Sequence, residues 1–328
     1  MINRYIPLYI ISFILALAVT AIVERRLIPL LSGRAAQPIY EDGPSWHSVK
    51  SGTPTMGGLA FLLAIATSST VAIVITLGIG EGRVALSIIT VIIYSILNAG
   101  VGIIDDTAKL KKKVNKGLSA KQKLLLQTLI AIGFLFARAY IFGDGTSVEL
   151  PFGTLELGLF YYPLSLVLLL GIVNCANLTD GIDGLATGVS FTVCAVLFLL
   201  SAHVLPDTAI ISASIMGICL GFMFFNIYPA RIFMGDTGSL FLGAAAVSCA
   251  FSFKNPFLIA IIGIVYVIEG VSVILQVVFF KKTGKRLFKM APLHHHFEKS
   301  GMSETKICLI AMIVTLLSSI PALILFTA

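Results

Sequence analysis

Charged residues are scarce in this chain, and this scarcity excludes an ordinary soluble fold. Only 12% of the 328 residues are Asp, Glu, Lys or Arg, whereas 57% are hydrophobic. A soluble domain carries about 25% charged residues. No hydrophilic stretch is long enough to fold separately. We therefore expect a single domain over residues 1–328, an all-α polytopic protein embedded in the lipid bilayer.

Other signals are missing as well. The five cysteines show no CxxC spacing and lie mostly in or beside apolar runs, so we interpret them as packing residues. The first 26 residues lack a small-residue cleavage site, which favours a retained helix over a removed signal peptide. No aromatic-basic module accompanies the net charge of +7, so nucleic acid is not an expected partner.

Long apolar runs are abundant instead. A helix needs about 20 apolar residues to cross a bilayer, and about ten transmembrane helices are expected. The runs at 158–173 and 240–253 are short and would lean on their neighbours or re-enter the membrane. The expected crossings are Tyr5–Val23, Gly58–Gly78, Val84–Ile104, Leu124–Phe142, Gly158–Val173, Gly188–Val204, Thr208–Phe225, Leu240–Phe253, Pro256–Phe280 and Ile307–Phe326.

Lysine and arginine are distributed unevenly between the two sides of this bundle. The loops on the side of the first connecting loop hold 19 of the 23 Lys and Arg residues. Loops rich in these residues stay in the cytoplasm, so both termini are expected to be extracytoplasmic. On the outer side, Gly143–Leu157 alternates around a central Pro-Phe-Gly-Thr, which predicts one small extracytoplasmic β-hairpin.

The unusual polar residues all fall in five loops of the cytoplasmic side. Inert helices that carry reactive loops at one end are a common way to build a site. The motifs are HSVKSGTPTMGG (47–58), GIIDDTAK (102–109), NCANLTDGIDG (174–184), NIYPARIFMGDTGS (226–239) and APLHHHFEKSG (291–301).

Five aspartates in these motifs are expected to meet near the membrane boundary. Carboxylates held close together repel one another unless a cation lies among them. Mg²⁺ prefers oxygen ligands and typically takes one or two carboxylates together with substrate phosphates. The sequence therefore predicts a Mg²⁺ site for a phosphate-bearing substrate. The aspartates are Asp105, Asp106, Asp180, Asp183 and Asp236.

Each of these features also has an ordinary structural explanation. Asp106 could cap the segment that follows it, and Asp180 or Asp183 alone could be a helix cap or an end group. Glycine beside aspartate can expose backbone N–H groups to phosphate, but it is equally typical of a loop turn.

Lysines and histidines add further candidates. Lys50 precedes a rigid Gly-Thr-Pro-Thr turn and could contact phosphate, while Lys121 and Lys123 begin the next helix near the acids. The histidine triplet at 294–296 does not favour zinc, because adjacent side chains diverge and no cysteine is near. We interpret one or two of these histidines as phosphate-binding or structuring groups.

One carboxylate lies inside an apolar run. Glu269 is either functional or a protonated group that packs between helices. Gln276, two helical turns further on, would face the same way.

Taken together, the five motifs resemble the bacterial phospho-N-acetylmuramoyl-pentapeptide transferases, in the superfamily of polyprenyl-phosphate N-acetylhexosamine-1-phosphate transferases. The resemblance implies that undecaprenyl phosphate attacks the β-phosphate of UDP-N-acetylmuramoyl-pentapeptide, giving lipid I and UMP for peptidoglycan synthesis. It also implies a Mg²⁺ requirement, a homodimer, and an active site on the cytoplasmic face of a bacterial plasma membrane.

The resemblance also implies roles for individual residues. Asp236 would be the Mg²⁺ ligand and Asp105 the general base, with Asp106 beside it and His295 in the catalytic group. Phe233 would stack on uracil, as aromatic side chains do with bases. The substrate-binding residues would be Lys50, Thr55, Lys121, Asn177, Asp180, Asp183, Asn226, Phe233, Gln276, His294 and His296.

Two other functions compete with this one. A UDP-N-acetylglucosamine-1-phosphate transferase would need the same acids, and only the resemblance separates the two sugars. A membrane cation transporter, with Glu269 on the ion path, would place polar residues along several helices. The polar residues are gathered at one end instead.

Overall fold

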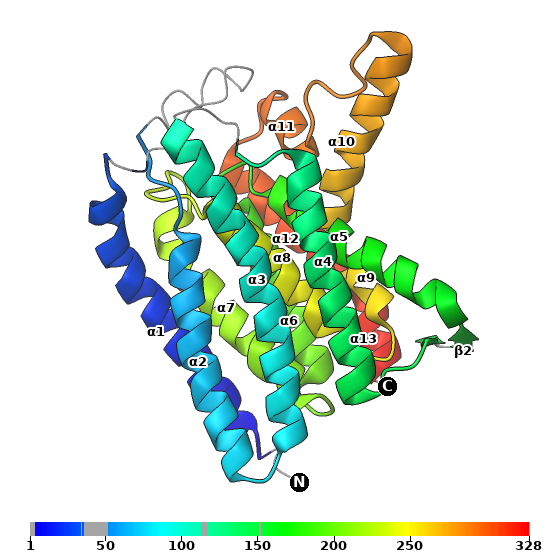
Figure 1. Cartoon of the computed structure of the whole chain (residues 1–328). Helices are drawn as coiled ribbons and strands as arrows, with labels where there is room; N and C mark the ends of the chain where they lie inside the picture. The colour runs from blue at the N-terminus through cyan, green and yellow to red at the C-terminus, as the bar shows by residue number, and fades with distance from the viewer. Residues whose placement is uncertain (1–3, 34, 36–51, 113–116, 151, 328) are drawn as a thin grey trace.

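The computed structural model describes residues 4–33, 35, 52–112, 117–150 and 152–327. These ranges are mostly helical, with one two-stranded sheet (Figure 1). The elements are α1 (Ile6–Leu31), α2 (Gly58–Gly78), α3 (Gly82–Lys112), α4 (Ala120–Ala137), η2 (Arg138–Phe142), β1 (Ser147–Leu150), β2 (Gly153–Glu156), η3 (Gly158–Phe160), α5 (Tyr161–Thr179), α6 (Leu185–Ser201), α7 (Pro206–Asn226), α8 (Gly235–Ala250), η4 (Pro256–Leu258), α9 (Ile259–Ile262), α10 (Ile264–Thr283), α11 (Leu293–Glu298), α12 (Glu304–Ser318) and α13 (Ile320–Thr327).

Among the described residues, eight helical segments are long and apolar enough to cross a membrane. The chain is therefore a multi-pass membrane protein, as its composition predicts. The run at 158–173 was expected to be short, but η3 and α5 together form a 22-residue span, Gly158–Thr179. The short apolar helix is α6, with 17 residues.

Helix α8 lies at the centre of the bundle and has only 16 residues. Every residue from Thr237 to Ala250 is buried, because α3, α5 and other helices surround it. The expectation that this short run leans on its neighbours is confirmed. When protein surrounds a helix on all sides, the length of that helix does not have to match the thickness of the hydrocarbon layer.

Close approach of three helices depends on glycine at their contacts. A Cβ atom on Gly58 of α2 would collide with the backbone of Gly238, and one on Gly102 of α3 would collide with the backbone of Asp236. Small residues at helix contacts allow backbones to pack tightly in membranes. This packing brings the end of α3 directly against the start of α8.

The expected run Pro256–Phe280 is not one helix. It divides into η4, α9 and α10, with the break at Gly263. After α10 the chain turns back and forms α11, a six-residue helix that carries the histidine triplet. Figure 1 shows α11 at the upper end of the bundle, whereas α1 begins in its lower part.

The predicted hairpin is confirmed. Strands β1 and β2 are antiparallel, with Ser147 opposite Glu156 and Leu150 opposite Gly153. The five cysteines are free, and Cys194, Cys219 and Cys249 are buried, in agreement with their interpretation as packing residues.

The contact at Gly102 can be tested with a matched pair of substitutions. Gly102→Ala pushes α3 away from the start of α8, and such overpacking costs about 1–3 kcal/mol. Gly100→Ala adds the same methyl group in the same helix, at a position where a Cβ would meet no described residue within 4 Å. We expect Gly102→Ala alone to lower the apparent melting temperature in detergent. Equal melting temperatures for the two variants would contradict this packing.

Candidate active site

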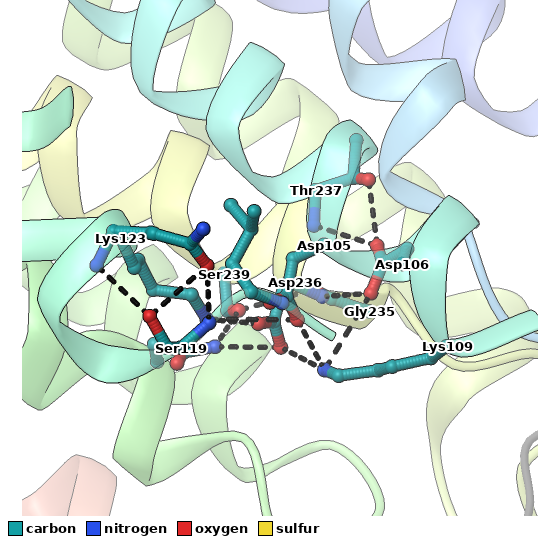
Figure 2. A network of polar contacts seen from close by, with 12 residues as sticks. Asp105, Asp106, Lys109, Ser119, Lys123, Gly235, Asp236, Thr237 and Ser239 are labelled. Atoms are coloured by element: carbon teal, nitrogen blue, oxygen red, sulfur yellow. Dashed lines mark hydrogen bonds and ion pairs between the residues drawn. The ribbon is translucent and has the colours of Figure 1, made fainter. Parts of the chain in front are cut away.

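Three carboxylates from two helices form the centre of the site. Asp105 and Asp106 lie near the end of α3, and Asp236 lies in the first turn of α8. One oxygen from each can be chosen so that all three lie within 4.8 Å of one another. Figure 2 shows them together with the lysines that contact them. Of the five aspartates expected to meet, these three form the group, and Asp180 and Asp183 lie outside it.

Asp106 is engaged by the backbone of α8. Its Oδ1 accepts a hydrogen bond from Asp236 N at 3.1 Å, and its Oδ2 accepts from Thr237 N and Thr237 Oγ1 at 2.9 and 2.7 Å. A carboxylate satisfies the free N–H groups of a helix start and interacts favourably with the helix dipole. Asp106 thus caps a distant helix rather than the segment that follows it, and it holds Asp236 in place.

Two lysines neutralise this cluster. Lys109 Nζ lies 2.7 Å from Asp105 Oδ2 and 3.2 Å from Asp236 Oδ1. Lys123 Nζ forms an ion pair with Asp236 and lies 3.7 Å from Asp105 Oδ2. Lys121, which the resemblance selected, is exposed. Sequence reasoning missed Lys109, although its spacing of four residues from Asp105 on one helix was a usable signal.

The start of α4 positions Lys123. Ser119 caps this helix with a capping box, in which its hydroxyl accepts from Gln122 N and Gln122 Oε1 accepts from Ser119 N. Just before the cap, Leu118 N donates to Asp105 Oδ1 at 2.7 Å. The same short segment therefore binds one acid through its backbone and a second through a lysine.

The end of α5 reaches the cluster from another direction. Asn177 Nδ2 donates to Asp236 Oδ1 at 3.1 Å and to Ser239 Oγ at 2.8 Å. Asp180 follows the helix as a half-buried residue. Burial of its carboxyl group, together with the carboxylates of Asp236, Asp106 and Asp183, raises the pKa of Asp180 to about 8. In this arrangement Asp180 keeps its proton at neutral pH.

Other predicted binding residues hold the neighbouring loops together. Asp183 Oδ2 accepts from Ala230 N at 2.9 Å. Asn226 is buried, accepts from Gly184 N at 3.1 Å and donates to Ile232 O at 3.0 Å. Both residues fasten the loop after α5 to the loop after α7.

The loop that precedes α8 is also fastened to the segment before α2. Phe233 N donates to Pro54 O, and Gly57 N donates to Phe233 O, both at 2.9 Å. Thr55 is buried beside Gly235, whose φ of 68° suits glycine. Lys50, the remaining predicted residue of this segment, lies outside the described residues.

The last predicted residues gather around α10 and α11. Gln276 Oε1 accepts from Leu287 N and Phe288 N at 3.1 and 2.9 Å, which holds the turn between the two helices. His296 Nδ1 accepts from Lys289 N at 3.1 Å. His295 contacts Glu298, and His294 contacts Glu269. These contacts are within the chain, and the substrate roles of Gln276 and the histidines stay predictions.

The acid cluster fits a divalent cation by its chemistry. Carboxylate oxygens are the donors that Mg²⁺ takes in phosphate-transfer sites, usually from one or two residues. The ammonium groups of Lys109 and Lys123 already lie against Asp105 and Asp236, so the site attracts positive charge. Asp236 could hold the ion, with Asp105 beside it, whereas both carboxylate oxygens of Asp106 accept hydrogen bonds from the backbone of α8.

Comparisons with known proteins agree with this arrangement. A family model described as glycosyl transferase family 4 matches residues 88–254, which include all three acids. Residues 50–62 match phospho-N-acetylmuramoyl-pentapeptide-transferase signature 1. A phospho-N-acetylmuramoyl-pentapeptide-transferase of Clostridium perfringens (strain SM101 / Type A) is 44% identical over 316 residues, with 94% of each chain covered. The chain belongs to the phospho-N-acetylmuramoyl-pentapeptide-transferase family.

Further members of this transferase family show the same extent of similarity. The one from Heliobacterium modesticaldum is 42% identical over 301 residues, covering 90% of this chain and 91% of its own. The one from Halalkalibacterium halodurans is 42% identical over 320 residues, with 96% of each chain covered. The similarity therefore extends over most of the length of the chain.

The raised pKa of Asp180 predicts a pH dependence of stability. The unfolded chain loses this proton near pH 4 and the folded chain near pH 8, so stability falls as pH rises across that window. Asp180→Asn removes this pH-dependent contribution to the stability of the fold. Without divalent ions, we expect the melting temperature of the variant to exceed that of the wild type increasingly from pH 5 to pH 8. A constant difference across this range would contradict the raised pKa.

Proposed function

We propose that this chain transfers the phospho-N-acetylmuramoyl-pentapeptide group from its UDP-linked donor to undecaprenyl phosphate, giving lipid I and UMP. The observation that carries the proposal is the convergence of Asp105, Asp106 and Asp236 with two lysines at one end of an apolar bundle. Membership in the transferase family supports the muramoyl-pentapeptide donor over UDP-N-acetylglucosamine.

The position of Asp105 suits a lipid acceptor. It lies near the end of α3, a helix that is long and apolar enough to span a membrane. The phosphate of a polyprenyl phosphate is confined to headgroup depth, so a group that reacts with it must lie at the end of such a helix. Lysines beside the acids attract both anionic substrates.

The reaction needs positioning and charge neutralisation more than covalent chemistry from the protein. Asp105 accepts the proton of the acceptor phosphate, whose oxygen attacks the β-phosphorus of the donor. The bond from that phosphorus to the bridging oxygen breaks, and UMP leaves. Lys109 and Lys123 neutralise the phosphates, and Asp236 would hold Mg²⁺, which would supply charge neutralisation at a diphosphate.

The neighbouring loops would bind the donor. Phe233 is half-buried next to the backbone contacts that join the segments before α2 and α8, and its ring is the proposed platform for uracil. Asn177 and Asp180, at the end of α5, would face the diphosphate. Lys50, Thr55 and Lys121 complete the proposed binding set.

The orientation in the membrane follows from the distribution of charge. We place the acid cluster on the cytoplasmic face of a bacterial plasma membrane, because the loops at this end carry most of the lysine and arginine. Ten crossings with both termini outside would satisfy this orientation. The homodimer is a proposal that rests on the resemblance alone.

The function can be tested by measuring UMP release. Purified protein with Mg²⁺ and polyprenyl phosphate should release UMP from UDP-N-acetylmuramoyl-pentapeptide and at least tenfold more slowly from UDP-N-acetylglucosamine. Asp236→Asn should reduce turnover at least a thousandfold, because it removes the charge that faces both lysines and the metal. Asp207→Asn, in a buried acid that hydrogen-bonds Ser87 and Ser252, is the control and should retain activity. Near-normal turnover in Asp236→Asn would remove the metal assignment.

The order of bond making and breaking has its own test. Direct displacement leaves no phosphate on the enzyme, whereas a two-step route would form an aspartyl-phosphate. Protein incubated with Mg²⁺ and donor labelled at the β-phosphate, without acceptor, should carry no covalent label after denaturation. A stoichiometric acid-stable label on Asp105 would establish the two-step route instead.

A further inference from the structure

Glu269 is a buried carboxylate inside an apolar helix. It lies in α10, which is long and apolar enough to span a membrane, and only 5% of its surface is exposed. A carboxylate in such a helix is costly unless the fold provides partners for it. Glu269 has no part in the proposed transfer reaction, so a different role must account for this buried carboxylate.

The partner of Glu269 is His294 at the start of α11. The His294 backbone N–H lies 3.2 and 3.3 Å from the two carboxylate oxygens, and His294 Nδ1 lies 3.1 Å from Oε2. We assign the proton of a neutral His294 imidazole to Nδ1, because a carboxylate accepts hydrogen bonds and Nδ1 is the ring nitrogen that faces it. The other ring nitrogen, Nε2, then presents a lone pair.

The lone pair of His294 faces the loop between α5 and α6. His294 is fully buried, and Nε2 has no hydrogen-bond partner among the residues that the structure describes. A Cβ atom on Gly181 would collide with Nε2, so the imidazole lies directly on the glycine backbone. A lone pair fits against a Cα–H group, whereas an N–H there would be a buried donor without a partner.

A second close contact lies next to the first. Gly270, which follows Glu269, lies against Cys175 of α5, and a Cβ on Gly270 would collide with the Cys175 sulfur. Helix α10 is therefore packed against α5 close to the point where α5 ends and the 180–184 loop begins. Asn177, between these two contacts, donates to Asp236 of the acid cluster.

We propose that Glu269 is a positioning residue for the transfer reaction. By holding His294 with its proton on Nδ1 and its bare Nε2 against Gly181, Glu269 determines where the end of α5 and the loop after it lie. Asn177 and Asp180 then face the donor diphosphate at the acid cluster. This inference rests on the proposed function, and it assigns Glu269 to donor binding rather than to an ion path.

The first experiment compares kinetic constants for the two substrates. Glu269→Gln keeps the shape of the side chain but places an amide N–H₂ or a neutral oxygen opposite Nδ1. We expect kcat/KM for the UDP-linked donor to fall 10- to 100-fold, as with other residues that orient a ligand. The KM for polyprenyl phosphate should stay within twofold of the wild-type value. Glu269→Asp, which keeps the charge, should recover at least part of the loss.

Ser272→Ala is the matched control. Ser272 is buried on the same helix, and within the described ranges its hydroxyl donates to the Glu269 backbone carbonyl alone, at 2.7 Å. Its removal should therefore leave both KM values unchanged. An unchanged donor KM and kcat in Glu269→Gln, or an equal loss toward both substrates, would overturn the positioning role. If Glu269→Gln does not fold, the same comparison between Glu269→Asp and the control decides the question.

A double-mutant cycle tests whether the effect passes through His294. Gly181→Ala disturbs the same imidazole from the opposite side, so the two losses should not multiply in the double variant. Fully multiplicative losses would contradict a shared path. The cycle is also run on melting temperatures without substrate, where the coupling should persist. If the wild-type protein releases no UMP at all, the proposed function fails, while the thermal cycle still tests the Glu269–His294–Gly181 contact.

Discussion

The site depends on the balance between carboxylates that repel one another and the cations placed among them. Asp105 and Asp236 are close enough to share both Lys109 and Lys123. In apolar surroundings such repulsion is strong, so the cluster is stable only with positive charge present. Burial, together with these negative charges, raises the pKa of Asp180 to about 8. A divalent cation that binds together with a phosphate ester would stabilise a site of this kind.

Helix packing brings these charges together and keeps water from screening them. Glycine contacts allow α2 and α3 to press against the start of α8, and Asp106 caps the α8 backbone at that point. The cap and the glycine contacts act on the same helix start, so the position of Asp236 is determined by backbone rather than by a flexible loop. On the other side, α10 and α11 support the end of α5. The bundle thus positions the acids from several directions.

Much of this arrangement could be predicted from the sequence, and the reasons for the exceptions are physical. Apolar runs predicted the helices, and the alternating segment predicted the hairpin, because both patterns are local. The convergence of Asp105, Asp106 and Asp236 followed from topology, since loops on one side of a membrane protein share one surface. The capping role of Asp106 could not be read from the sequence, because its partner is 130 residues away in α8. The choice between Lys121 and Lys123 depends on which side of α4 faces the acids, and packing of α4 against α3 and α5 decides this rather than any local pattern. The break at Gly263 could not be predicted because an isolated glycine is often tolerated inside a helical pattern, and α11 is too short, at six residues, to show a helical period.

The most direct test of the account locates the cation itself. Crystals of the protein grown with Mn²⁺ and UDP would show the metal by its anomalous scattering. The account predicts a peak within coordination distance of the Asp236 carboxylate, on the side that faces Asp105. A metal bound at the histidine triplet, or no peak at Asp236, would contradict the claim that these acids form the centre of a metal-dependent transfer site.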